Sequence, residues 1–557
     1  MPANLGEKHH IDTEVTDEAK VHHEDATTLT AKSGDQLQAT KKSVRWSSNN
    51  MSSLDSIDDN NLESATGSHQ KRRRGLGEAS NKDGQASTEQ ALGVSQGIDG
   101  GTDGGADGCH FSQDLRGLYL DTINRARLDF DFEKLCSVSL SNINVYACLV
   151  CGKYFQGRGR SSNAYYHSMG ENHHVFINLD TLNVYVLPEL YRVDDSSLND
   201  IKYVIKPTFS EKAVQMLDSH SIHSYDLNNK MYLPGFVGLN NIKENDYINV
   251  IVQSFSHVGL IRDYFLLQKY TGSSELVSRF GLLLRKMWSS RAFKGQVSPH
   301  ELIQEISNAS SKRFKLGEQA DPAQFLSWLI NKLHLGMSSK GDHAPSIIQQ
   351  AFQGELRIES TPIALDQGTG ENTISDSVLP TTSISPFWFL TLDLPAPPLF
   401  TDEAEKNIIP QIPLTTLLAK FDGKTVHKTS TTSTIYKIQK LPRYLIFCFK
   451  RFSKNNWNAS EKNPTIVNFP IKNLDMTDYV EGGVNCRYDL IANICHEGKP
   501  GTGNGSYKVH LASKEKGRWL QIQDLFVEEI MAQMIILSET YIQIWVKSSS
   551  VGSTDEV

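Results

Sequence analysis

Large apolar residues are sparse over the first 110 or so residues and frequent from Leu118 onwards. The early segment is rich in Ser, Thr, Gly, Asp, Lys and His, and it ends in a glycine-aspartate run at 97–108. Such a composition cannot bury enough apolar surface to offset the entropy lost on ordering. We therefore predict a disordered polar tail over residues 1–115, and a second, short disordered tail over 549–557.

A helical pattern of apolar residues begins after residue 230. Apolar residues spaced i, i+3, i+4 and i+7 predict an amphipathic helix that starts near Asp246, with this aspartate as its N-cap. The four positions that carry this stripe are Ile248, Ile251, Val252 and Phe255. Similar stripes predict helices over 277–288 and 325–335, and a shorter helical segment over 210–219 lies in a predicted linker at 208–229.

The second half of the chain instead favours strands. Residues 444–449 form a continuous β-prone apolar run, as in a strand buried on both faces, and residues 541–545 predict another strand. Two low-complexity stretches, at about 367–385 and 424–433, are interpreted as surface loops. Helices followed by strands in one domain over 230–548 indicate an α+β fold.

Charge and composition narrow the class of protein. The net charge of −8 argues against global attraction to nucleic acid, and we find no direct nucleic-acid-binding motif. One basic cluster, Lys71, Arg72, Arg73 and Arg74, is either a solvated charge cluster or a nuclear import signal. Seven cysteines favour a reducing compartment over a disulfide framework. We expect neither a signal peptide nor a membrane span.

A candidate zinc site lies in the aromatic-, Cys- and His-rich segment that follows the tail. Two thiolates in a Cys-x-x-Cys turn and two imidazoles suit tetrahedral zinc, and such a site would stabilise a small domain. The ligands we predict are Cys148, Cys151, His167 and His173. His174 is the alternative to its neighbour His173, and the competing interpretation is buried cysteines with ordinary surface histidines.

This segment, over 116–207, resembles the UBP-type zinc finger. Several fingers of that type bind a second zinc, and here the matching positions hold Cys136, Ser139 and Asn163. The resemblance thus implies a degraded second site, with Cys136 as a remnant or an auxiliary ligand. Lys153 stands where ubiquitin-binding fingers have an arginine, which leaves ubiquitin binding by the finger in doubt.

The tract 238–249 resembles the nucleophile box of the ubiquitin-specific proteases, Gly-Leu-x-Asn-x-Gly-x-Thr-Cys-Tyr-Met-Asn. Further family signatures follow in order at 319–326, 352–354, 392–395, 441–452 and 469–471. The resemblance covers residues 230–548. It implies a papain-like fold with a helical thumb and a β-rich palm and fingers subdomain. This fold follows the small zinc-stabilised UBP-type finger in the chain.

The same resemblance implies that the catalytic triad is lost. Asp246 stands at the cysteine position, Ser506 at the histidine position and Gln523 at the third position, whereas the oxyanion-type Asn241 is retained. A carboxylate is a poor nucleophile toward an isopeptide, and serine cannot act as a base near neutral pH. We therefore predict a pseudo-peptidase.

One alternative is a relocated catalytic centre. Cys495 adjoins His496, but successive residues of a strand point to opposite faces, so this pair should diverge. His510 could approach the old base position, where it would find no thiol to activate.

The finger, the altered triad and the basic tail together resemble a non-catalytic branch of the family among splicing factors of the spliceosomal tri-snRNP. That resemblance implies a zinc-binding nuclear protein that contacts tri-snRNP proteins and helps to assemble or maintain the particle in pre-mRNA splicing. The alternatives are a ubiquitin-binding adaptor and a deubiquitinase with a non-standard catalytic centre.

Overall fold

The protein is described from a computed structural model that covers residues 119–548, except 220–222, 339–343, 366–371, 375–379, 397–408, 430–431, 455–459, 484, 500–504, 514 and 516. The two predicted tails and the basic cluster Lys71–Arg74 lie outside these described residues. Among the helices of the described part, none combines the length and the apolar character that a membrane crossing needs.

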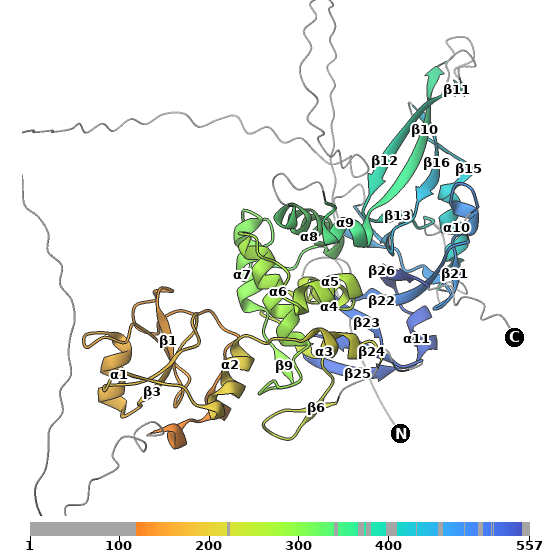
Figure 1. Ribbon diagram of the computed structural model, residues 1–557. Coiled ribbons are helices and arrows are strands. Elements are labelled where there is room, and N and C mark those ends of the chain that lie inside the picture. The colour runs from red at the N-terminus through yellow and green to blue at the C-terminus, as the bar shows by residue number, and fades with distance from the viewer. Residues whose placement is uncertain are drawn as a thin grey trace, which may run out of the picture. The chain divides into compact units, whose positions relative to one another are not determined.

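The first folded segment is a five-stranded antiparallel sheet with two helices (Figure 1). Helix α1 lies between β2 and β3 in the chain, and α2 follows β5. The strands, in their order across the sheet, are β2 (Tyr154–Gln156), β1 (Val145–Cys148), β3 (Val175–Asn178), β4 (Val184–Val186) and β5 (Tyr191–Val193). The helices are α1 (Asn163–Glu171) and α2 (Asn199–Ile205).

Helices dominate the next segment, and the predicted apolar stripes correspond to three of them, α4, α6 and α8. All residues of α4 are buried, because it is packed between other helices and the sheet strand β23. The helices are α3 (Glu211–Met216), α4 (Asp246–Ser256), α5 (Gly259–Leu266), α6 (Glu275–Met287), α7 (His300–Ala309), α8 (Pro322–Met337) and α9 (Ile347–Phe352). The ranges predicted for α4, α6 and α8 were therefore correct to within a few residues.

An eight-stranded sheet packs against these helices (Figure 1). Along β17, alternate side chains belong to two cores: Ile446 faces the helices, and Phe447 faces a second apolar cluster. Burial on both faces explains the uninterrupted apolar run. The order is β13 (Leu390–Asp393), β17 (Tyr444–Lys450), β26 (Thr540–Lys547), β22 (Arg487–Gly498), β23 (Gly505–Ala512), β24 (Trp519–Gln523) and β25 (Phe526–Ile530), with β21 (Leu474–Asp475) also paired to β22.

Within the two stretches that we predicted as surface loops, the described residues are mostly strands of a second sheet, so for these residues the prediction was wrong. Strands β10 and β16 pair over eight positions and recruit the polar neighbouring segments into the sheet, which composition alone did not reveal. Its members are β11 (Asn372–Ile374), β10 (Gly354–Leu365), β16 (Thr432–Lys440), β15 (Asp422–Lys428) and β12 (Thr381–Phe387).

Short elements complete this part of the chain. Four two-stranded ladders pair β6 (Ser224–Tyr225) with β7 (Met231–Tyr232), β8 (Gly238–Leu239) with β9 (Gln296–Val297), β14 (Gln411–Pro413) with β20 (Ile466–Asn468), and β18 (Phe452–Lys454) with β19 (Ser460–Lys462). The helices α10 (Leu414–Leu418) and α11 (Ala532–Ile536) contribute to the second apolar cluster.

An acidic segment that precedes the finger sheet contacts the helical segment. The buried Lys286 ammonium of α6 donates to the Phe130 carbonyl at 2.8 Å and to the Asp131 carboxylate at 2.8 Å. The second Asp131 oxygen accepts from the Ser298 backbone N–H at 3.1 Å. Lys294 pairs with Asp129 at 2.5 Å. These contacts leave the buried ammonium with both a charge partner and a carbonyl acceptor.

We expect Asp131→Ala to lower the free energy of unfolding by roughly 2–4 kcal/mol, since it leaves a buried ammonium without its counter-charge. Urea unfolding monitored by fluorescence measures the change. The double variant Asp131→Ala/Lys286→Met should recover part of the loss, and the exposed Asp121→Ala serves as the control. Equal midpoints for Asp131→Ala and Asp121→Ala would show that this contact contributes nothing.

Candidate functional site

The site that the sequence singles out lies at the N-terminus of α4. The helix begins at Asp246, and its N-cap is Asn245, whose side chain makes no capping hydrogen bond within the helix. The predicted N-cap was therefore wrong by one residue. Asp246 occupies the first helical position, where a carboxylate still complements the helix dipole.

The Asp246 carboxylate is a hydrogen-bond acceptor for three separate segments. Gln319 Nε2 donates to its two oxygens at 3.1 and 3.0 Å, and the backbone N–H of Tyr507, on β23, donates at 2.9 Å. The N–H of Tyr247 donates at 2.9 Å. Gln319 Nε2 also reaches the Gly505 carbonyl at 3.1 Å. One carboxylate thus connects α4, the segment before α8, and the sheet.

Burial sets the electrostatics of this carboxylate. Asp246 is only 3% exposed, and desolvation raises its pKa above the ordinary value of 3.8. The hydrogen bonds from Gln319, Tyr507 and Tyr247 oppose that rise without cancelling it. The donors therefore offset only part of the free-energy cost of burying the charged carboxylate. Both of its oxygens accept hydrogen bonds.

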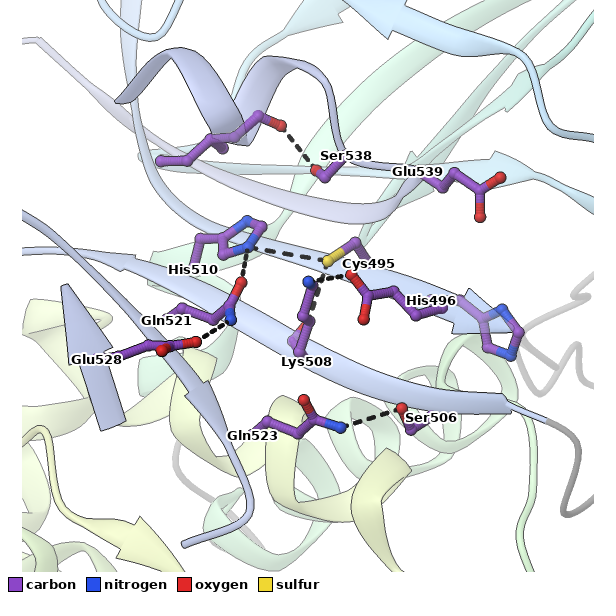
Figure 2. Close-up of polar contacts among 12 residues, drawn as sticks. Cys495, His496, Ser506, Lys508, His510, Gln521, Gln523, Glu528, Ser538 and Glu539 are labelled. Carbon is purple, nitrogen blue, oxygen red and sulfur yellow. Dashed lines mark hydrogen bonds and ion pairs between the residues drawn. The ribbon is translucent and has the colours of Figure 1, made fainter. Parts of the chain in front are cut away.

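The other two positions at which the sequence predicts a lost triad residue lie beside this network. Gln523 Nε2, on β24, donates to the Ser506 hydroxyl on β23 at 3.1 Å (Figure 2). The residues on either side of Ser506 are Gly505 and Tyr507, and both take part in the Asp246 network. The structure therefore brings Asp246, Ser506 and Gln523 into one region, in which Ser506 and Gln523 bond to each other.

Asn241 has both ends of its side-chain amide engaged. Its Nδ2 donates to the Asp524 carboxylate at 2.9 Å, and its Oδ1 accepts from the Asn245 backbone N–H at 3.2 Å. Asn249 Nδ2 donates to the other Asp524 oxygen at 3.2 Å. The amide donor that the family would direct at an oxyanion is directed here at a carboxylate.

The hydrogen bonds from Gln319 to Asp246 and from Asn241 to Asp524 were not predicted from the sequence. Gln319 opens one of the family signatures, and Asp524 follows Gln523 directly, so their positions gave a signal. Their sequence distance from α4 hid the contact, because Gln319 is 73 residues from Asp246 and Asp524 is 283 residues from Asn241.

A thiol and an imidazole do meet elsewhere, on the strands β22 and β23. Cys495 Sγ lies 4.0 Å from His510 Nε2, and this nitrogen also contacts Gln521 Oε1 at 3.0 Å (Figure 2). Burial raises the pKa of Cys495 to about 12 and lowers the pKa of His510 to about 4. At neutral pH both groups are uncharged and at most 1% exposed, so they lack the thiolate and the access that a nucleophile needs. His496 turns instead toward Phe452 and Tyr507.

The four predicted metal ligands converge in the finger. The ligand atoms of Cys148, Cys151, His167 and His173 all lie within 4.8 Å of one another. Cys151 Sγ is 3.3 Å from His167 Nε2, which is 3.0 Å from His173 Nδ1. Tetrahedral zinc with these ligands requires donor separations of about 3.3–3.8 Å. The donor set therefore fits zinc in chemistry; the Cys151–His167 separation is at the lower end of this range, and the two imidazole nitrogens lie closer together than the range.

The pKa shifts of the two thiols in this cluster have opposite directions: the hydrogen bond with Cys151 and burial raise the pKa of Cys148. A hydrogen bond with Cys148 and the nearby His167 lower the pKa of Cys151 to about 4, although burial opposes the shift, and they favour the thiolate that zinc binds. Gly152 directly follows the ligand Cys151 and has φ +80°. A Cβ at this position would lie 2.3 Å from the Arg127 carbonyl oxygen. The tight turn thus requires glycine.

Two other candidates of the finger lie outside that cluster. His174 contacts the Leu187 carbonyl and the Asn172 side chain at 2.7 and 2.8 Å. Cys136 is absent from the group of converging ligands; its sulfur accepts from the N–H of Ser139 and from the amide of Asn163, each at 3.4 Å. Hydrogen-bond donors therefore surround Cys136 where the resemblance implied a degraded second zinc site.

Comparisons with known families match this geometry. Residues 237–545 match the family described as ubiquitin carboxyl-terminal hydrolase, and residues 136–198 match the zinc finger found in ubiquitin hydrolases and other proteins. Together these regions define a zinc-finger protein with a ubiquitin-specific-protease-like α+β fold, which confirms the predicted fold class. The chain belongs to the ubiquitin carboxyl-terminal hydrolase family.

Its relatives at 33–49% identity include proteins named or described as splicing factors. The chain is 47% identical over 448 residues to "Probable mRNA-splicing protein ubp10" of Schizosaccharomyces pombe, covering 78% of this chain and 89% of that protein. It is 49% identical over 449 residues to human "Ubiquitin carboxyl-terminal hydrolase 39", covering 77% of this chain and 79% of that protein. A solved structure described as an essential yeast splicing factor is 33% identical, with a TM-score of 0.64, and covers 77% of this chain and all of that one. The predicted resemblance to splicing factors of this family is thus confirmed.

We expect Asp246→Ala to lower the free energy of unfolding by about 1–3 kcal/mol, because the buried Tyr507 N–H and the Gln319 amide lose their acceptor. Asp246→Asn, which keeps one acceptor oxygen and removes the desolvated charge, should cost less. Thermal and urea unfolding measure both changes.

Glu211→Ala is the matched control, since Glu211 is an exposed acidic residue at the first position of α3. It tests the contribution of a helix dipole without a hydrogen-bond network. If Asp246→Ala behaved like Glu211→Ala, the cross-segment network would have no energetic role.

Proposed function

We propose that this protein is a non-catalytic pre-mRNA splicing factor of the nucleus, which acts as a scaffold in assembling or maintaining the spliceosomal tri-snRNP. The similarity to proteins named as splicing factors supports the process. The observation that carries the non-catalytic role is Asp246, whose buried carboxylate is already bonded on both oxygens. The basic cluster Lys71–Arg74 is the proposed nuclear import signal.

The chemistry of the site supports that proposal. Hydrolysis by this family's mechanism needs a thiolate, a base that generates it, and a donor for the oxyanion. The proposed assignments place a carboxylate, a hydroxyl and an amide at the triad positions, namely Asp246, Ser506 and Gln523. Asn241 gives its donor to Asp524. None of these four side chains supplies the thiolate that would form the tetrahedral intermediate.

We further propose that Cys148, Cys151, His167 and His173 hold one Zn²⁺. The ion would be structural, since four protein ligands complete a tetrahedron and leave no open position for substrate. It would hold the turn after β1, helix α1 and the start of β3 together, because these three elements supply the ligands. The finger would then depend on metal for its fold.

A ubiquitin probe with a C-terminal electrophile should form no covalent adduct with the wild-type protein, in contrast to an active ubiquitin-specific protease. Asp246→Cys should also remain unreactive beyond the background of an isolated thiol, because Ser506 cannot serve as its base. Intact-protein mass spectrometry measures the adduct. Rapid labelling of the wild type would contradict the pseudo-peptidase and support a non-standard catalytic centre.

Affinity purification of the full chain from nuclear extract should recover tri-snRNP proteins and the small nuclear RNAs. RNA sequencing and protein identification read out the result, and an unrelated zinc-finger protein provides the background. A purification without small nuclear RNAs would count against the splicing role. The alternative of a ubiquitin-binding adaptor predicts saturable ubiquitin binding in a titration with the same preparation.

Elemental analysis should find one zinc per chain. His173→Ala should lose the ion, while His174→Ala and Cys136→Ser should retain it, because their side chains lie outside the ligand cluster. A chelator should lower the unfolding temperature of the wild type. Two zinc ions per chain, or zinc loss in the Cys136 variant, would contradict the single-site assignment.

A further inference from the structure

Strand β25 is an unprotected edge of the eight-stranded sheet. It pairs with β24 on one side, in the register that sets Phe526 against Gln523 and Ile530 against Trp519. Among the described residues no strand pairs with its other side. Edge strands of this kind present free backbone N–H and C=O groups, and proteins usually shorten, bulge or cover them.

Apolar side chains are exposed along this edge and just beyond it. Phe526 is 77% exposed, although phenylalanine is normally buried, and Met531, before α11, is 70% exposed. Thirteen consecutive positions from 525 to 537 contain six exposed large apolar residues, namely Leu525, Phe526, Val527, Met531, Met534 and Leu537. An exposed apolar stretch on a sheet edge is typical of a binding surface.

The charges of the strand restrict what can bind there. Glu528 and Glu529 are both exposed on β25. Arg518 lies 3.3 Å from Glu529, whereas Glu528 contacts the amide of Gln521 at 2.6 Å and has no ion pair within the described part of the chain (Figure 2). A second copy of β25 would bring these acidic side chains together, which is unfavourable across a strand pair. A strand with basic residues would neutralise them.

We propose that β25 binds an extended segment of a partner protein by strand addition, and that the segment carries basic residues between apolar ones. An antiparallel segment opposite Ile530 to Phe526 would read apolar, basic, basic, apolar, apolar. Its backbone would satisfy the free edge, its basic side chains would face Glu528 and Glu529, and its apolar side chains would cover Phe526 and Val527. This surface is separate from the zinc cluster, and Asp246 takes no part in it.

A fluorescent peptide, Thr-Val-Lys-Arg-Val-Tyr-Thr, tests the proposal against the full-length protein by fluorescence anisotropy. A peptide of reversed order covers parallel pairing, and Thr-Val-Glu-Glu-Val-Tyr-Thr is the charge-reversed control. The basic peptide should bind at least about fivefold more tightly than the acidic one. Its binding should slow hydrogen exchange of the amides at 526–530.

Two variants decide whether the strand is responsible. Glu528→Lys should remove the preference for the basic peptide while both peptides still bind, because one attractive and one repulsive pair then face each peptide; unfolding would abolish binding of both. Phe526→Ser, at a position that is mostly solvent-exposed, should weaken both peptides without lowering the unfolding temperature. Equal binding of both peptides, no effect of Glu528→Lys, or a concentration-dependent dimer abolished by Phe526→Ser would overturn the proposal.

Discussion

The buried carboxylate of Asp246 is the constraint on which the arrangement of the site depends. A charge that is removed from water must be compensated by donors, and here those donors come from segments far apart in the chain. Gln319 and the Tyr507 N–H can both reach the carboxylate only if the helices and β23 keep their present separation. A thiol at this position would be a weak acceptor and could not draw these segments together in the same way.

The surrounding amides follow from the same requirement. Asp524 is a second carboxylate close to the first, and it raises the pKa of Asp246 further. The amides of Asn241 and Asn249 donate to Asp524 and stabilise its charge. An amide that stabilises a transient oxyanion during catalysis cannot at the same time be hydrogen-bonded to a permanent carboxylate. The amide donors therefore form hydrogen bonds within the protein, whereas catalysis would need these donors to remain available for the oxyanion.

The elements with strong periodicity could be predicted from the sequence, and the contacts across the fold could not. Local apolar patterns predict the helices α4, α6 and α8 and the strands β17 and β26. A helix buried along one stripe and a strand buried on both faces each require a recognisable spacing of apolar residues in the sequence. The strands β12 and β15 are polar and take their conformation from the pairing with β10 and β16, so local composition misled. The four zinc ligands were predictable because residue type and turn spacing carry the chemistry. Gln319 was not, since only the tertiary fold brings it to Asp246.

The strand β24 links the altered site to the exposed edge. On one face it places Gln523 against Ser506 and Gln521 against both His510 and Glu528 (Figure 2). The opposite face of β24 contributes Ile522 to the core around α4. In an active protease of this fold, a partner that stiffened or shifted β24 would disturb the third triad position. If Gln523 holds that position, as we propose, a partner can bind at the sheet edge without a catalytic penalty, because this amide is bonded to Ser506.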